Sequence, residues 1–241
     1  MNVFGVVLDL LFPPKCPFCR RVVDGAAVCG ACEKSLPWTK GEEGLYPGLD
    51  ELFCAAPLFY EGAVRDALLR LKFRGADHLA RPLGELLARC AAERFAGEFD
   101  AVTWVPVGPK RLKERGYDQA RLLAESACRL WETAPERLLV KMGDNPAQSG
   151  LADAAARRSN VLGMYQIAPG ARVAGRRILL IDDICTTGST LAECVRTLRR
   201  GGAERVVCAA VARTRPERDE QRAGGEKLVN FSTLQNVLAI L

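Results

Sequence analysis

Residues 177–191 read Arg-Ile-Leu-Leu-Ile-Asp-Asp-Ile-Cys-Thr-Thr-Gly-Ser-Thr-Leu, and this stretch decides the fold of the chain. Its apolar part, Ile178 to Ile181, is typical of a strand buried on both faces of a sheet. Two carboxylates follow where that strand is expected to end, and a hydroxyl-rich loop follows them. Beyond the loop, apolar residues recur at helical spacing, at Leu191, Cys194, Val195 and Leu198. Because Gly201-Gly202 then ends the helix, the stretch predicts a strand, a loop and a helix in succession.

The loop of this unit is suited to bind an anion, because free N–H groups and the helix dipole meet at a helix N-terminus. Gly188 lets the backbone approach a phosphate, and hydroxyl groups add donors. The hydroxyl donors are Thr186, Thr187, Ser189 and Thr190. Asp182 and Asp183 would repel a phosphate, so we expect them to accept hydrogen bonds from the hydroxyls of a ribose. The stretch therefore predicts a site for a ribose 5-phosphate; the alternative is a buried strand whose aspartates cap the helix.

Two Cys-x-x-Cys pairs near the start of the chain indicate a metal site. The four cysteines are Cys16, Cys19, Cys29 and Cys32. Four thiolates complete a tetrahedron and leave no open position, so we expect a structural zinc ion. The segment is too short for an apolar core of its own, so metal binding would supply its folding energy. A pair of redox dithiols is the alternative.

Together these two motifs resemble a known family. The run from Leu179 to Leu191, an apolar strand followed by Asp-Asp and Thr-Thr-Gly-x-Thr, resembles the ribose-phosphate fingerprint of type I phosphoribosyltransferases. A four-cysteine ribbon ahead of that fingerprint is similar to the competence protein F (ComF) family, also called GntX-like. The resemblance covers roughly residues 5–213.

A basic segment follows another predicted strand, Ala101 to Val107. Its cations are Lys110, Arg111, Lys113 and Arg115. Ligands of open α/β sheets bind beyond the carboxyl ends of the strands, so we expect this cationic loop to hold a pyrophosphate group; a solvated basic turn is the alternative. The family has a similar run, matched here at Arg111, Arg115, Gly116, Tyr117 and Gln119. Asp118 stands where Asn is usual, which weakens a direct phosphate contact at that position.

Strands alternate with helices from residue 52 onward, which predicts an α/β fold with a mainly parallel sheet and helices on both faces. The resemblance implies that this sheet has the type I phosphoribosyltransferase-like architecture, with a small N-terminal zinc ribbon added. We expect three regions. Residues 1–50 form an N-terminal helix and the zinc ribbon, residues 51–215 form the phosphoribosyltransferase-like domain, and residues 216–241 form a tail of unknown role.

The composition limits which ligands, metal centres and cellular compartments are expected. The net charge of +5 permits anionic ligands without requiring nucleic acid. The single histidine, His78, excludes multi-histidine metal centres. The chain has 10 cysteines but neither a recognisable secretory signal nor an apolar run long enough to cross a membrane. We therefore expect a cytoplasmic protein whose cysteines are thiols or metal ligands.

Two further segments carry candidate residues. The helix that ends at Leu-Lys-Phe-Arg-Gly has a counterpart in the family, so Lys72 and Arg74 either approach the cleft or form a solvated helix end. The polar stretch 143–159 is weakly patterned, as is typical of a lid. The family has a comparable run here, and the resemblance implies that either Arg157 or Arg158, not both, is functional.

The resemblance implies that the chain binds phosphoribosyl pyrophosphate with Mg²⁺ through the Asp182–Thr190 loop. It also implies a phosphoribosyltransferase activity and, in some members, a link to DNA uptake during competence. Asp182 and Asp183 would then be the catalytic residues, and Cys185 a variable position rather than a nucleophile. Two alternatives stay open: a non-catalytic factor that handles single-stranded DNA together with competence or DNA-processing proteins, and a sugar-phosphate sensor.

Overall fold

The computed structural model describes residues 13–41, 45–47, 53–143 and 163–215. Three sequence-based expectations lie outside these residues: the helix at 1–12, most of the lid with its two arginines, and the tail from residue 216. The strand, helix and loop around residues 177–202 lie within them.

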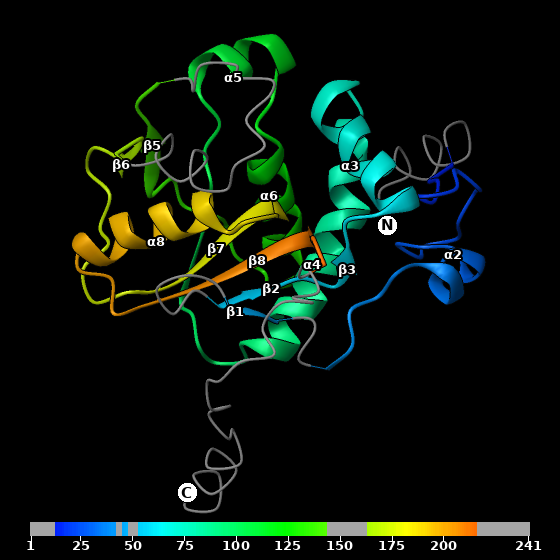
Figure 1. Cartoon of the computed structure of the whole chain (residues 1–241), viewed down its shortest axis with the longest axis horizontal. Coiled ribbons are helices and arrows are strands. Elements are labelled where there is room, and N and C mark those ends of the chain that lie inside the picture. Colours follow the sequence, from blue (N-terminus) through cyan, green and yellow to red (C-terminus); the bar gives the residue numbers. More distant parts are fainter. Residues whose placement is uncertain (1–12, 42–44, 48–52, 144–162, 216–241) are drawn as a thin grey trace, which may run out of the picture.

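A six-stranded sheet forms the centre of the molecule (Figure 1). Its strands are β1 (Leu45–Pro47), β2 (Phe53–Ala55), β3 (Leu58–Phe59), β4 (Ala101–Trp104), β7 (Arg177–Cys185) and β8 (Arg205–Arg213). They are ordered β1-β2-β8-β7-β4, with β3 also paired to β8. Only β1 runs antiparallel to its neighbour, so the expected mainly parallel sheet is confirmed.

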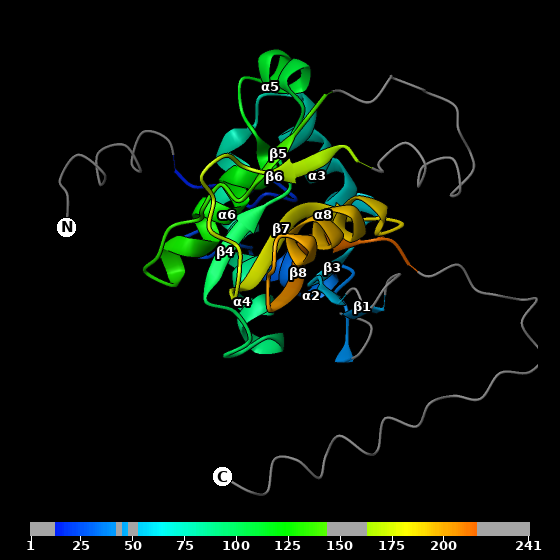
Figure 2. The ribbon, with the colours of Figure 1, turned by 90° about the vertical axis from the view of Figure 1, so that its left-hand side faces the viewer.

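Helices cover both faces of this sheet, as the sequence predicted (Figures 1 and 2). The helices of the described residues are α2 (Gly30–Ser35), α3 (Gly62–Phe73), η3 (Asp77–Leu79), α4 (Ala80–Arg94), α5 (Pro109–Arg115), α6 (Gln119–Leu130) and α8 (Ser189–Arg200). Leu179 and Ile181 of β7 share a core cluster with α3, α4 and α6. Their neighbours Ile178 and Leu180 share the other cluster with α8. A strand with both faces buried explains why residues 178–181 are all apolar.

The central strand β7 is longer than expected. It continues past Ile181 to Cys185, and Asp182 lies opposite Ala210 of β8. The acids therefore lie on the strand itself, because backbone pairing with β8 continues beyond the apolar run. The loop between strand and helix shrinks to residues 186–188, and the expected Asp182–Thr190 loop includes the ends of both elements.

The basic segment after β4 is a short helix, α5, and not the loop that we expected. Pro109 occupies the first turn, where a missing N–H costs nothing. Gly116 ends the helix in the left-handed conformation, with φ of 79°, and its N–H donates to Leu112 O over 2.9 Å. Pro109 at the start and Gly116 just after the end explain why these seven residues form a helix. The density of charge between them led us to expect a loop.

The described residues between 35 and 47 also contribute to the sheet. Strand β1 pairs antiparallel with β2, and Trp38 forms an isolated bridge with Leu58. A separate antiparallel pair, β5 (Leu139–Lys141) and β6 (Tyr165–Ile167), flanks α8. Strand β1 therefore forms one edge of the sheet, and the β5–β6 pair packs beside α8.

Asp118 ties α6 to β4 and to the connection that follows β4. Its Oδ1 accepts the N–H groups of Ala120 and Arg121 and so caps α6. Its Oδ2 accepts from Trp104 Nε1 at 3.2 Å and from Val107 N at 3.1 Å. The residue that departs from the family pattern is therefore a structural acceptor, with both oxygens engaged by the protein.

Asp118→Ala should lower the free energy of unfolding by about 2–4 kcal/mol, because it removes a cap and leaves partly buried donors without acceptors. Asp118→Asn should lose less, since its oxygen can still cap α6 while its amide opposes the Trp104 donor. Urea unfolding measures both. Glu125→Ala is the control, because it removes only an exposed pair with Arg121 worth at most about 0.5 kcal/mol. Equal stability of Asp118→Ala and the control would contradict this role for Asp118.

Candidate functional site

The acid pair Asp182–Asp183 lies near the carboxyl end of the central strand and is nearly buried, at 9% and 3% exposure. The Oδ1 atom of Asp182 accepts the N–H of Asp183 at 2.8 Å. Burial and the neighbouring Asp183 charge raise the pKa of Asp182 well above its ordinary value. Two adjacent carboxylates in a buried strand are costly, so the surroundings must supply positive charge.

Lys72 supplies part of that charge. It comes from the last turn of α3, and its Nζ lies 2.9 Å from Asp183 Oδ2. Apart from this ion pair, that buried oxygen accepts no hydrogen bond from the described part of the chain. Burial alone would lower the pKa of Lys72, but the charge and hydrogen bond of Asp183 outweigh burial and raise it. The structure thus brings Lys72 into the site, while Arg74 stays exposed at the helix end.

The predicted phosphate loop, residues 186–190, begins directly after β7. Gly188 is buried, has φ of 70° and forms the N-cap of α8. The hydroxyls of Thr187 and Ser189 lie 2.9 Å apart, Thr186 is exposed, and Thr190 is partly buried. Together with Asp182 these residues line a hollow of about 30 Å³. All five sequence-predicted phosphate ligands therefore line one small concavity at a helix N-terminus.

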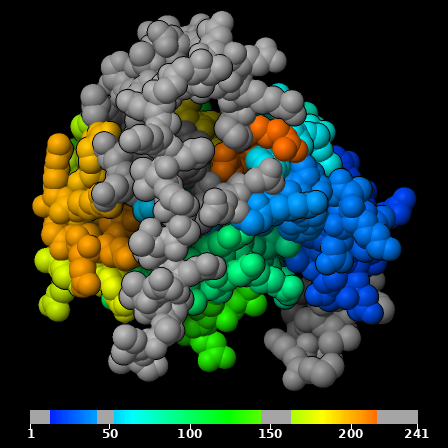
Figure 3. Space-filling model, turned by 60° about the horizontal axis from the view of Figure 1, so that its bottom comes forward, coloured from blue at the N-terminus to red at the C-terminus, as the bar shows by residue number. Residues whose placement is uncertain are grey.

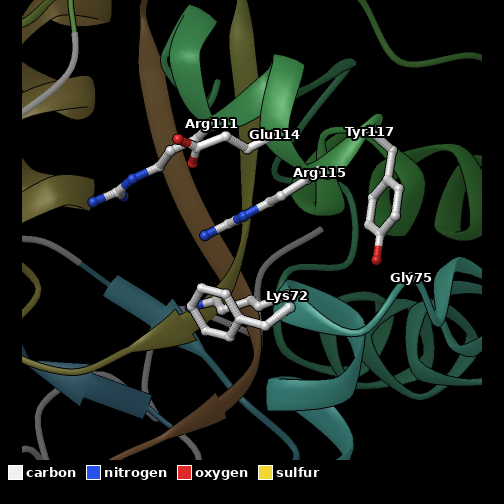
Figure 4. A pocket seen from close by; sticks show the side chains of 7 residues that line it. Lys72, Gly75, Arg111, Glu114, Arg115 and Tyr117 are labelled. Atoms are coloured by element: carbon white, nitrogen blue, oxygen red, sulfur yellow. The ribbon is translucent and has the colours of Figure 1, made fainter.

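A second, larger pocket of about 580 Å³ lies between α3 and α5 (Figure 4). Its lining residues are Lys72, Phe73, Gly75, Arg111, Glu114, Arg115 and Tyr117. Arg115 extends from α5 toward α3, with its guanidinium 4.9 Å from the centre of the Phe73 ring and Nη1 2.8 Å from Gln119 Oε1. Burial and the charge of Arg111 lower the pKa of Arg115, and Asp183 opposes this shift. The pocket is thus cationic, and its Lys72 is the lysine that pairs with the acids.

Sequence reasoning placed the basic residues only in part. Arg111 and Arg115 line the pocket as expected, whereas Lys110 is exposed at the start of α5 and does not line it. The sequence-based prediction did not include Glu114, which also lines the pocket. Arg111, Glu114 and Arg115 stand three and four positions apart, a helical spacing that would have placed them on one face. Treating the segment as a loop hid that signal.

The four N-terminal cysteines also come together. The Sγ atoms of Cys16, Cys19, Cys29 and Cys32 all lie within 4.8 Å of one another. Hydrogen bonds, first from the backbone of Cys32 and then from Cys19, lower the pKa of Cys29 to about 7. Four sulfur donors at this spacing fit a closed, structural zinc site.

Cys185 differs from these thiols. It lies in β7 with 1% exposure, packed in the core cluster that includes α8. A hydrogen bond with the Cys54 thiol is the main cause that lowers its pKa. The predicted description of Cys185 as a non-nucleophile stays a prediction, and its burial is consistent with it.

Comparison with known proteins agrees with this architecture. A double zinc ribbon domain family matches residues 7–43, and a phosphoribosyl transferase domain family matches residues 144–234. Competence protein F of Haemophilus influenzae is 28% identical over 209 residues, which cover 82% of this chain and 90% of that protein. The chain is a homologue of competence protein F, with a double zinc ribbon and a phosphoribosyl transferase domain.

Other homologues of this group carry related names. DNA utilization protein YhgH of Escherichia coli is 27% identical over 203 residues, covering 83% of this chain and 84% of that protein. Competence protein ComFC of Bacillus subtilis is 27% identical over 188 residues, covering 78% and 72%. Among solved structures, a glutamine phosphoribosylpyrophosphate amidotransferase from B. subtilis aligns with a TM-score of 0.40 at 21% identity, over 58% of this chain and 30% of that chain. In the described ranges no helix is both long and apolar enough to span a bilayer.

Asp182→Asn should raise stability at pH 7.5 by about 1–2 kcal/mol. An acid whose pKa is raised by folding stabilises the protein below the unfolded value of about 3.9 and loses that contribution as the pH rises. The amide keeps the acceptor for Asp183 N without the charge. Urea unfolding at pH 7.5 and pH 5 should show a smaller gain at pH 5. The exposed Asp66→Asn is the control; a less stable Asp182→Asn at pH 7.5 would contradict the charge balance.

Proposed function

We propose that this protein binds phosphoribosyl pyrophosphate and transfers its phosphoribosyl group to an acceptor. One observation carries the proposal: a helix N-terminus, a buried acid pair and a cationic pocket adjoin one another around the end of β7. In that order, these three sites match the 5-phosphate, the ribose hydroxyls and the pyrophosphate of the ligand. The match to a phosphoribosyl transferase domain supports the same conclusion.

The 5-phosphate would bind at the start of α8. The backbone N–H groups of residues 186–190 would donate to the anion, and the positive end of the helix dipole would face it. The left-handed Gly188 keeps the turn tight, because a side chain there would be strained. The Thr and Ser hydroxyls, which are Thr186, Thr187, Ser189 and Thr190, add donors on the open side.

The ribose hydroxyls would face Asp182 and Asp183, directly or through the waters of a magnesium ion. Among the residues that the structure describes, the buried Asp183 Oδ2 is paired with the Lys72 ammonium alone, which leaves it able to accept a further cation. Carboxylate oxygens are the donors that Mg²⁺ prefers, so the acid pair fits the ion. When bound, Mg²⁺ supplies positive charge next to the pyrophosphate. The chain itself supplies Lys72 for the same purpose.

The pyrophosphate would lie in the pocket lined by Arg111 and Arg115, with Lys110 on the outer side of α5. In the transfer, the bond from ribose C1 to the pyrophosphate oxygen breaks and a bond from C1 to the acceptor forms. The leaving oxygen gains negative charge, which the two guanidinium groups and Lys72 stabilise. Such chemistry depends on positioning and charge more than on a nucleophilic side chain.

We place this function in a chain of three regions, residues 1–50, 51–215 and 216–241, acting in the cytoplasm. Four zinc-binding thiols favour a reducing compartment. The domain match extends to residue 234, so part of the third region belongs with the transferase domain in that comparison.

A second candidate function is the handling of single-stranded DNA, alone or with competence and DNA-processing proteins. The observation that favours it is the Phe73 ring, 65% exposed beside the Arg115 guanidinium, since bases stack on such pairs. The relatives named for competence and DNA utilization point the same way. Oligonucleotide binding that weakens steeply with salt would support it, and turnover with candidate acceptors would separate a transferase from a sugar-phosphate sensor.

Calorimetric titration with phosphoribosyl pyrophosphate and Mg²⁺ tests the first proposal. Wild type should bind with measurable heat, and Asp183→Asn should bind at least about tenfold more weakly, because it loses one charge-assisted contact. Asp66→Asn makes the same chemical change on the exposed side of α3 and should bind like wild type. No heat with wild type, or equal affinity in Asp183→Asn, would rule the proposal out.

A further inference from the structure

The zinc ribbon is packed into the transferase domain. Its buried residues belong to the same core cluster as α3 and α4, and they are Cys16, Phe18, Val23, Val28, Cys32 and Leu36. Leu68 and Leu71 of α3 are fully buried in that cluster. Figure 3 shows the surface of the ribbon continuous with that of α4, where Arg94 donates to Gly41 O at 2.6 Å. The ribbon and α3 therefore belong to one close-packed core.

One hydrogen bond connects the metal site directly to α3. The Nη2 atom of Arg70 donates to the carbonyl of Pro17, which stands between the first two zinc ligands, Cys16 and Cys19. Arg70 is half-buried and also donates from Nε to Asp66 O at 3.4 Å. A half-buried guanidinium bonded to a knuckle carbonyl fixes that helix turn relative to the knuckle.

The same helix turn carries Lys72. Residues 70 and 72 project about 200° apart around a helix axis, so Arg70 and Lys72 can contact opposite partners. Between them, Leu71 O accepts the hydroxyl of Tyr117. The final turn of α3 is thus held by the ribbon at Arg70, by Tyr117 at Leu71 and by Asp183 at Lys72.

We propose that the zinc-bound ribbon positions Lys72 against Asp183 through Arg70, so that loss of zinc weakens the sugar-phosphate site. An ion pair of 2.9 Å is lost when one partner shifts by an ångström or two, and release of the Arg70 turn permits such a shift. Arg70 is then a positioning residue and the ribbon a metal-dependent support. The ligand in this inference rests on the proposed function, but the Lys72–Asp183 contact does not.

A ribbon that serves only as a separate binding module leads to a different expectation. Loss of zinc would then leave Lys72 and its pairing with Asp183 unchanged. The accessibility of the Lys72 amine distinguishes the two cases, because a paired ammonium reacts slowly with acylating reagents. Asp183→Asn defines the reactivity of the released lysine.

The experiment uses the full zinc-loaded chain and Arg70→Met, which keeps an apolar stem. Arg65→Met, an exposed arginine on the same helix, is the matched control. Zinc content, Lys72 acetylation followed by mass spectrometry, and affinity for phosphoribosyl pyrophosphate are measured. Arg70→Met should retain zinc, acetylate Lys72 about fivefold faster and bind the ligand about five- to tenfold more weakly. Arg65→Met should match wild type, and a chelator should reproduce the Arg70→Met effects in wild type.

Wild-type reactivity and affinity in a folded Arg70→Met chain, or in the chelated wild type, would overturn the inference. If Arg70→Met does not fold, the chelated wild type decides, and a Lys72 reactivity equal to that of the zinc-loaded chain would again overturn the inference. Failure of wild type to bind phosphoribosyl pyrophosphate refutes the proposed function only. In that case a Lys72 reactivity that still responds to Arg70 and zinc supports the ribbon's role.

Discussion

The ion pair between Lys72 and Asp183 is the contact on which the rest of the site depends. It joins the last turn of α3 to the end of the central strand, across 111 positions of sequence, at 2.9 Å. Two adjacent carboxylates cannot stay in a buried strand without compensating charge. Lys72 of α3 supplies one cation directly, and Arg115 of α5 senses the charge of Asp183.

The site is therefore less stable than a purely structural core would be. The raised pKa of Asp182 means that its charge opposes folding at neutral pH. Stability is regained in the surrounding layers, where Leu179 and Ile181 pack against one helix layer and Ile178 and Leu180 against the other. The apolar residues of β7 thus stabilise the fold, and the acids at its carboxyl end form the candidate site.

Much of this architecture could be predicted from the sequence. The apolar run at 178–181, the helical spacing after it and the cysteine pairs are local signals, and each led to the element or cluster that the structure contains. The errors have physical causes. Pairing with β8 extended β7 beyond the apolar run, and a proline and a glycine made α5 a helix where charge density suggested a loop. The Lys72–Asp183 pair is long-range, so no spacing in the sequence could fix it.

The central claim is that the end of β7 holds a phosphorylated pentose, with its phosphate at the start of α8 and its hydroxyls at the acid pair. A crystal structure of the chain soaked with ribose 5-phosphate tests this most directly. The account predicts density for the phosphate against the N–H groups of residues 186–190 and for the ribose hydroxyls within hydrogen-bond distance of Asp182 or Asp183. A sugar bound elsewhere, or a phosphate loop left empty at saturating ligand, would contradict it.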